Sequence, residues 1–162
     1  MIAKIIIEGP DCSGKSTLAD RVKNMLFWDA KSLHHKEGNQ FKRYLQEYVL
    51  GEQVVFNRAH FSENVYSRLW RGGSPFLEQE RIILNSICAI DTLTILALPS
   101  LEVIQQRYEA RKFPQQIKYE ELKPCRELFL EELKDFPHIL YTAKDYEELD
   151  ATLKTVYEKV KG

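Results

Sequence analysis

A glycine-rich segment near the start of the chain constrains the fold more than any other feature. Residues 9–16 satisfy the phosphate-loop pattern GxxxxGK(S/T), and they lie between a short apolar run and an amphipathic segment. This context predicts a strand, a loop whose backbone N–H groups cradle phosphates, and a helix whose dipole favours negative charge. The residues that we expect to bind the phosphates of a nucleoside triphosphate are Gly9, Asp11, Cys12, Ser13, Gly14, Lys15, Ser16 and Thr17.

Two side chains of this loop carry specific chemistry. Lys15 is expected to bring a cation to the β- and γ-phosphates, and the Ser16 hydroxyl is expected to be a ligand of Mg²⁺. The sequence therefore predicts ATP and Mg²⁺ as cofactors.

Apolar runs of strand length alternate with helical patterns along the rest of the chain. Buried strands are predicted at residues 5–7, 54–56, 93–98 and 138–141, with one more before His34. Amphipathic helices follow the phosphate loop and close the chain, where Asp145 and Glu148 predict a capping box. We predict an α/β, three-layer P-loop NTPase fold in one domain over residues 1–162, with a central parallel sheet of about five strands flanked by helices.

Composition limits the partners and the cellular location that we expect. A net charge of −1 gives no basic field, so no nucleic-acid partner is expected. No stretch reaches membrane-spanning length, so no membrane partner is expected either. The three cysteines form no CxxC pair, which indicates a reducing, cytoplasmic location. Cys12 lies at a helix N-terminus beside Lys15, which predicts a stabilised thiolate.

Other classes of P-loop protein lack support. A GTPase needs a guanine-reading NKxD and a DxxG switch, and neither pattern occurs. The chain has no room for the arginine-finger domain of a motor or assembly ATPase. A kinase that acts on a small substrate is what the motif then favours.

Two blocks of sequence resemble thymidylate kinases. Residues 7–17 resemble that family's EGxDGxGKST loop, although Cys12 stands where glycine is usual. Residues 57–66, followed by Arg71 and Gly72, resemble the DRxHxxExVY…RG pattern of compact, often virus-encoded members. The resemblance covers most of the chain in order, and only these two blocks are specific. It implies a deoxynucleoside monophosphate kinase.

The resemblance implies roles for two residues of these blocks. Asp11 matches the carboxylate that approaches the sugar 3′-hydroxyl of the monophosphate, and Arg58 matches the arginine that clamps the acceptor phosphate. The planar, always-charged guanidinium suits bidentate phosphate binding. A strand-end salt bridge is the alternative role for Arg58.

Asn57 departs from the family pattern, because the family has an aspartate there that helps to hold Mg²⁺. Asparagine removes that negative charge, so metal affinity is expected to fall. The nearby carboxylates Glu8 and Glu63 are able to substitute for it, although a structural role is favoured for each. The expected metal set is Ser16, Glu8 and Asn57.

A lid is predicted over residues 105–120. Arg107 and Arg111 are four positions apart, which places both on one face of a helix that Ser100 caps. In related kinases such a lid closes over the nucleotides and brings arginines to the transferring phosphoryl group. The alternative is a solvated basic helix end.

Several further residues are candidates for acceptor binding. His35 and Lys36 follow the predicted second strand, where the family binds the acceptor, and Tyr66 lies where it can wall a base pocket. With Asp11 and Arg58 they form the predicted substrate set. His60 is placed to reach the site, without a specified role.

The leading prediction is ATP-dependent phosphorylation of a deoxynucleoside monophosphate, such as dTMP or a related pyrimidine nucleotide. A deoxynucleoside kinase is the alternative, and it needs a carboxylate near the second strand, for which Glu37 is the candidate. A weakly catalytic nucleotide-binding protein is the third alternative. The resemblance implies a homodimer, whereas the short chain favours loss of the dimer surface.

Overall fold

The central strand organises the molecule, because its side chains alternate between two cores. The computed structural model describes residues 1–162 and places β1 (Lys4–Glu8) in the middle of a sheet. Ile5 and Ile7 pack into one core, Ile6 packs into another, and all three are fully buried. A run without polar alternation is what a strand covered on both faces requires.

The sheet has five strands, and every pair is parallel. Its order is β2-β3-β1-β4-β5, which confirms the predicted parallel sheet. The remaining strands are β2 (Asp29–Ser32), β3 (Val54–Asn57), β4 (Thr92–Ala97) and β5 (Ile139–Tyr141).

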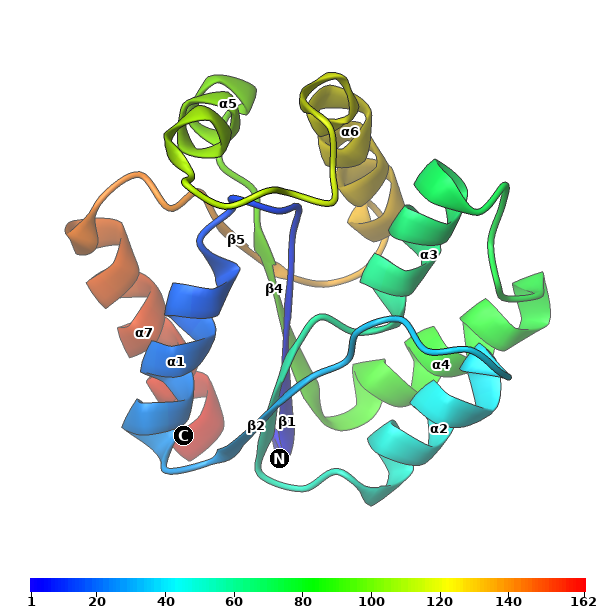
Figure 1. Ribbon diagram of the computed structural model, residues 1–162. Coiled ribbons are helices and arrows are strands. Elements are labelled where there is room, and N and C mark those ends of the chain that lie inside the picture. Colours follow the sequence, from blue (N-terminus) through cyan, green and yellow to red (C-terminus); the bar gives the residue numbers. More distant parts are fainter.

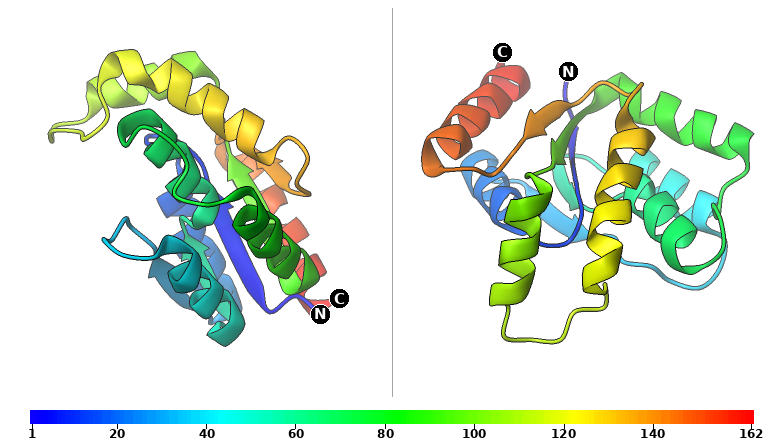
Figure 2. Two further views of the ribbon diagram at one scale, coloured as in Figure 1. Left: turned by 90° about the vertical axis from the view of Figure 1, so that its right-hand side faces the viewer. Right: turned by 90° about the horizontal axis from the view of Figure 1, so that it is seen from above.

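Helices cover both faces of this sheet (Figure 1). One face carries α1 (Lys15–Leu26) and α7 (Tyr146–Lys161), and the opposite face carries α2 (Gln40–Leu50), α3 (His60–Trp70) and α4 (Glu78–Asp91). At the carboxyl ends of the strands lie α5 (Leu101–Ala110), a short 3₁₀ turn η1 (Tyr119–Glu121) and α6 (Leu122–Leu133), as the view from above shows (Figure 2).

Three details differ from the sequence-based expectations. Helices α2 and α4 are not among the elements predicted from the sequence. Asp145 caps α7 as predicted, but Glu148 accepts from the N–H groups of Thr142 and Lys144 instead of completing the capping box. Ser100 caps α5, but that helix ends at Ala110, so Arg111 leaves it in an extended conformation. Arg107 and Arg111 therefore do not share a helical face.

The strand order places the phosphate loop at the centre of the carboxyl edge. Strand β1 lies between β3 and β4. The chain that follows β1 leads to α1 on one face of the sheet, and the chain that follows β3 leads to α3 on the opposite face. Ile7 pairs with Asn57, and the Arg58 N–H donates to the carbonyl of Ile7 at 3.1 Å. The topological switch point of a parallel sheet is where ligands bind, and the two motif blocks meet there.

None of the helices is both long enough and apolar enough to cross a membrane.

Candidate active site

The phosphate loop curls through residues in left-handed backbone conformations. Gly14 precedes α1 with φ 84°, and Cys12 has φ 64° although it is not glycine. This conformation gives a physical reason for glycine at the position of Cys12 in the family that the loop resembles. The Cys12 side chain is buried against the core that α3, α5 and α6 share.

The predicted thiolate at Cys12 is wrong. Burial raises the pKa of the Cys12 thiol above its ordinary value, and this effect exceeds the lowering by Arg111 and Lys15. Only 3% of the residue is exposed. The helix terminus is present as expected, but the side chain points into a core rather than toward the loop's polar face.

Three charged side chains meet at the phosphate loop. Arg58 Nη2 donates to Asp11 Oδ1 at 2.6 Å, and Lys15 Nζ lies 3.8 Å from the same oxygen. Lys15 Nζ also donates to the carbonyl of Pro10 at 3.1 Å. Burial and the neighbouring Arg58 lower the pKa of Lys15 to about 8. A phosphate bound here would face two cations that are already held in place.

Ser16 and Asn57 present oxygens beside these charges. Asn57 Nδ2 donates to Ser16 Oγ at 3.2 Å, while Asn57 Oδ1 is buried and has no hydrogen-bond partner. No group of three or more His, Cys, Asp or Glu side chains lies close enough to form a metal site. Mg²⁺ usually needs only one or two protein ligands beside phosphates and water, so this pair fits a phosphate-bound Mg²⁺.

Glu8 has a different environment from the one expected of a metal ligand. Its Oε1 accepts from the N–H groups of Ala59 and Ser62, and its Oε2 accepts from the Ser62 hydroxyl. The carboxyl group thus caps the N-terminus of α3 from the end of β1. It ties the phosphate loop to the helix that follows Arg58.

Replacing Glu8 by glutamine is expected to change how stability depends on pH. Burial raises the pKa of Glu8 from 4.5 to about 7, so the folded protein keeps this proton to a higher pH than the unfolded chain. The stability from this group is complete below pH 4.5 and is lost as pH rises to about 7. Relative to wild type, Glu8→Gln should therefore gain about 3 kcal/mol of unfolding free energy across that window.

Urea unfolding between pH 4 and 8 measures this difference. Burial lowers the pKa of His60 to about 4, which gives the opposite trend as pH falls below its ordinary 6.5. Both proteins contain His60, so its contribution cancels in the comparison. A difference in unfolding free energy that stays constant with pH would contradict the role of Glu8.

Three cavities adjoin one another along the carboxyl edge of the sheet. The donor cavity, of about 440 Å³, is lined by Cys12, Gly14, Thr17, Arg107, Arg111, Tyr141, Ala143, Lys144, Asp145, Tyr146 and Leu149. The phosphate cavity, of about 300 Å³, is lined by residues 11–17 together with Ser32, His34, Asn57, Arg58 and Arg111. The acceptor cavity, of about 270 Å³, is lined by Leu33, His34, His35, Arg58, Ser62, Glu63, Tyr66, Trp70, Arg71 and Gln116.

Shared residues fix the order of these cavities. Arg111 is common to the donor and phosphate cavities, whereas His34 and Arg58 are common to the phosphate and acceptor cavities. The phosphate loop therefore lies between two spaces, with Arg58 at the entrance to the second. This is the layout that two substrates need if they are to meet end to end.

The predicted lid segment extends from the donor side to the acceptor side. Arg107 donates to the carbonyls of Cys12 and Ala143, so it braces the phosphate loop against the chain after β5. Arg111 lines the phosphate cavity but donates to Gln115 at 2.8 Å. Gln116, from the same connection, lines the acceptor cavity. The two arginines thus have unequal positions, and only Arg111 borders the space for the phosphates.

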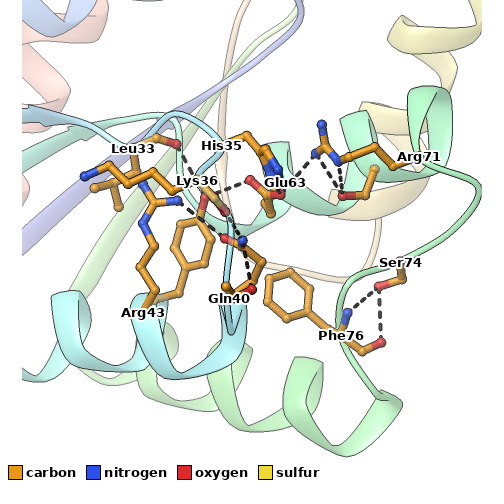
Figure 3. A network of polar contacts seen from close by, with 12 residues as sticks. Leu33, His35, Lys36, Gln40, Arg43, Glu63, Arg71, Ser74 and Phe76 are labelled. Atoms are coloured by element: carbon orange, nitrogen blue, oxygen red, sulfur yellow. Dashed lines mark hydrogen bonds and ion pairs between the residues drawn. The ribbon is translucent and has the colours of Figure 1, made fainter.

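A buried carboxylate lies at the centre of the acceptor side (Figure 3). Glu63 Oε1 accepts from Arg71 Nη2 at 3.0 Å and lies 2.6 Å from His35 Nδ1. The side chain of Glu63 is 2% exposed. Across the cavity, Tyr66 packs beneath the Arg58 guanidinium, 5.2 Å from ring centre to carbon, and beside Trp70.

Some predicted residues are not brought into these cavities. Lys36 lines none of the three, and its carbonyl accepts from Gln40. His60 is buried in a core, 2.6 Å from the Tyr48 hydroxyl and 2.7 Å from Asn85 Oδ1. Glu37, proposed as the base of a nucleoside kinase, is also absent from the acceptor cavity.

Sequence reasoning missed parts of the site that no local motif marks. It assigned no contact to Gln116 and used Arg71 only as part of a pattern. The donor-cavity residues after β5 were also missed. For Arg71, the signal is its spacing of four residues from Ser67 and eight from Glu63, which lets the residue that ends α3 reach back to both side chains.

No protein-family model and no curated protein matches the chain. Among solved structures, YorR from Bacillus subtilis, in complex with phosphorylated GDP, matches with a TM-score of 0.82 at 20% identity, covering 98% of this chain and 95% of YorR. Deoxyadenosine kinase from M. mycoides matches with 0.64 at 16% identity over 98% of each chain. Thymidylate kinase from Candida albicans matches with 0.60 at 16% identity, over 99% of this chain and 92% of that one.

These similarities show that the chain has the fold of P-loop kinases. A shikimate kinase matches as well as the thymidylate kinase does, with a TM-score of 0.60. The fold alone therefore does not select one class of phosphoryl acceptor.

Proposed function

We propose that this protein transfers the γ-phosphoryl group of ATP to a deoxynucleoside monophosphate, dTMP or a related nucleotide. The observation that carries the proposal is the position of Arg58. It lines both the phosphate cavity and the acceptor cavity, and it is held 2.6 Å from Asp11 of the phosphate loop. A fixed guanidinium at that junction suits an acceptor that is itself a phosphate.

The residues of the chain supply positioning and charge. Backbone N–H groups of residues 12–16 and the Lys15 ammonium hold the β- and γ-phosphates. Arg58 aligns the acceptor phosphate with the γ-phosphate, and Arg111 approaches the transferring group when residues 105–120 close. The acceptor phosphate is already a competent nucleophile, so the reaction needs no general base. Charge neutralisation and alignment then account for catalysis.

Ser16 and Asn57 are the residues that would hold Mg²⁺ in this site. When bound, the metal neutralises charge on the β- and γ-phosphates. The neutral amide at Asn57 makes the protein's contribution to metal affinity smaller than an aspartate would.

Replacing Asn57 by aspartate is expected to lower the Mg²⁺ concentration that gives half-maximal activity, on the order of 10-fold. The substitution puts a carboxylate oxygen in place of Asn57 Nδ2, which lies 3.2 Å from Ser16 Oγ. A Mg²⁺ titration of ADP formation measures this. Asn39→Asp is the matched control, since Asn39 caps the distant helix α2 and aspartate caps equally well. An unchanged titration midpoint for Asn57→Asp would remove Asn57 from the metal site.

A nucleoside kinase is the second function that an observation favours, because Glu63 is a carboxylate in the acceptor cavity. Its Oε1 already accepts from Arg71 and lies 2.6 Å from His35 Nδ1, so this oxygen is occupied in the structure. The name of YorR's bound compound, phosphorylated GDP, and the deoxyadenosine kinase match both support a nucleotide or nucleoside as acceptor.

ADP formation with a panel of nucleosides and their monophosphates tests the proposal. We expect ADP only with a monophosphate, and its loss in Lys15→Ala. Dependence on a nucleoside instead would establish the alternative. ATP binding without turnover on any acceptor would place the protein in the nucleotide-binding class.

A further inference from the structure

Only two side chains border both the phosphate cavity and the acceptor cavity, and they are those of Arg58 and His34. His34 follows β2, so it lies at the same carboxyl edge of the sheet as the phosphate loop. An acceptor phosphate that Arg58 binds at this junction therefore also lies beside His34. What His34 presents to that phosphate depends on its protonation.

Hydrogen bonds fix which nitrogen of the neutral His34 ring carries the proton. Ser32 Oγ donates to the carbonyl of Asn57 at 3.1 Å, and His34 Nε2 lies 3.0 Å from the same Oγ. A serine hydroxyl has a single proton, so its oxygen accepts from His34 Nε2–H. The other nitrogen, Nδ1, is then unprotonated, and no protein group bonds it. The ring thus has a free position for a second proton.

The surroundings of His34 keep its ring neutral in the free protein. Burial lowers the pKa of His34 below its ordinary value, and Arg58, Lys15 and Arg43 lower it further, whereas Asp11 raises it. The other charged side chains that line the two cavities are those of Glu63, Arg71 and Arg111. Cations thus outnumber carboxylates around the ring. A phosphate dianion at the junction would add negative charge there and favour the protonated ring.

We propose that His34 is a second binding residue for the acceptor phosphate and that it takes up a proton when the phosphate occupies the junction, an inference that rests on the proposed function. The oxygens of a phosphate dianion only accept hydrogen bonds, and the one N–H of the neutral ring is already bound to Ser32. The imidazolium instead offers a second positive charge beside that of Arg58. A nucleoside, which carries no phosphate, should cause no such uptake, so His34 favours a phosphorylated acceptor.

Calorimetric titration of the full chain with dTMP tests the inference, without ATP and Mg²⁺ and in buffers that differ in ionisation enthalpy. The dependence of the binding heat on the buffer gives the number of protons taken up. At a pH of about 7, wild type should take up roughly 0.5 proton more per dTMP than His34→Gln. Glutamine keeps an N–H for Ser32 but has no titrating nitrogen, so a merely structural role of His34 would leave this number unchanged.

The pH dependence of the affinity gives a second readout of the same experiment. Wild type should bind dTMP roughly 10-fold more tightly than His34→Gln at a pH of about 6, because the ring is easily protonated there. This advantage should disappear as the pH rises to about 9, where protonation of the ring becomes too costly.

His138→Gln is the matched control. His138 is an exposed histidine whose Nδ1 lies 2.7 Å from the carbonyl oxygen of Phe136, and it lines none of the three cavities of the site. This variant should match wild type in proton uptake and affinity, and thermal unfolding verifies that both variants fold. Equal proton uptake in wild type and His34→Gln, an affinity difference that does not change with pH, or no binding of dTMP would overturn the inference. Phosphoryl transfer is measured separately, so proton uptake by His34 without turnover would count against the proposed function alone.

Discussion

Replacing Arg58 by methionine is expected to lower kcat/KM for the monophosphate about 10³-fold and to leave ATP binding nearly intact. Methionine keeps much of the side-chain length and suits the packing on Tyr66, but it removes the charge that neutralises the acceptor phosphate. In this variant Lys15 Nζ still lies 3.8 Å from Asp11 Oδ1, so the phosphate loop retains one cation for ATP. Steady-state kinetics with varied acceptor, together with calorimetry for ATP, measure the two effects.

Arg68→Met is the control for this substitution. Arg68 belongs to α3 but pairs with Glu131 and Glu132 outside the site, so its removal should change kcat/KM by less than about 3-fold. If Arg58→Met were as active as Arg68→Met, the guanidinium at the junction of the cavities would have no part in transfer.

Gly9→Ala is expected to lower the free energy of unfolding by roughly 3 kcal/mol or more. Gly9 has φ 152°, and a Cβ atom there would lie 2.2 Å from the carbonyl oxygen of Ala97. That oxygen belongs to the backbone of β4, so no side-chain rotation relieves the contact. Either β4 must move from β1 or the start of the phosphate loop must shift, and urea unfolding measures the cost.

Gly72→Ala separates the clash from backbone strain. Gly72 also has a positive φ, 80°, but nothing lies within 4 Å of a Cβ atom built there. We expect it to lose only about 1 kcal/mol. Equal losses in the two variants would show that the approach of β4 to Gly9 has no energetic consequence.

The sequence predicted the parts of this structure that local patterns encode. The phosphate loop has glycines at backbone positions that other residues adopt with strain, and the buried runs of β1 and β3 lack polar alternation. Lys15 follows the first buried run and Arg58 follows the run that forms β3, so the sequence was enough to place both at the carboxyl edge of one sheet.

The remaining differences concern the tertiary contacts of individual side chains, which a single sequence does not encode. The Cys12 thiolate was predicted from its helix terminus, but a core contributed by three other helices buries the thiol and raises its pKa. Glu8 was considered for metal binding because of its place beside the loop, yet the N-terminus of α3 occupies both its oxygens. Helix α2 was missed because its polar N-terminal turn obscured the buried Tyr44 and Tyr48.

The most direct measurement follows the γ-phosphoryl group itself. The protein is incubated with γ-labelled ATP, Mg²⁺ and dTMP, with thymidine in parallel and Lys15→Ala as the inactive control, and the labelled products are separated. We predict label in dTDP, and none in a thymidine product or in the Lys15→Ala reaction. Label that reaches only inorganic phosphate, at the same rate with and without a monophosphate, would contradict this prediction.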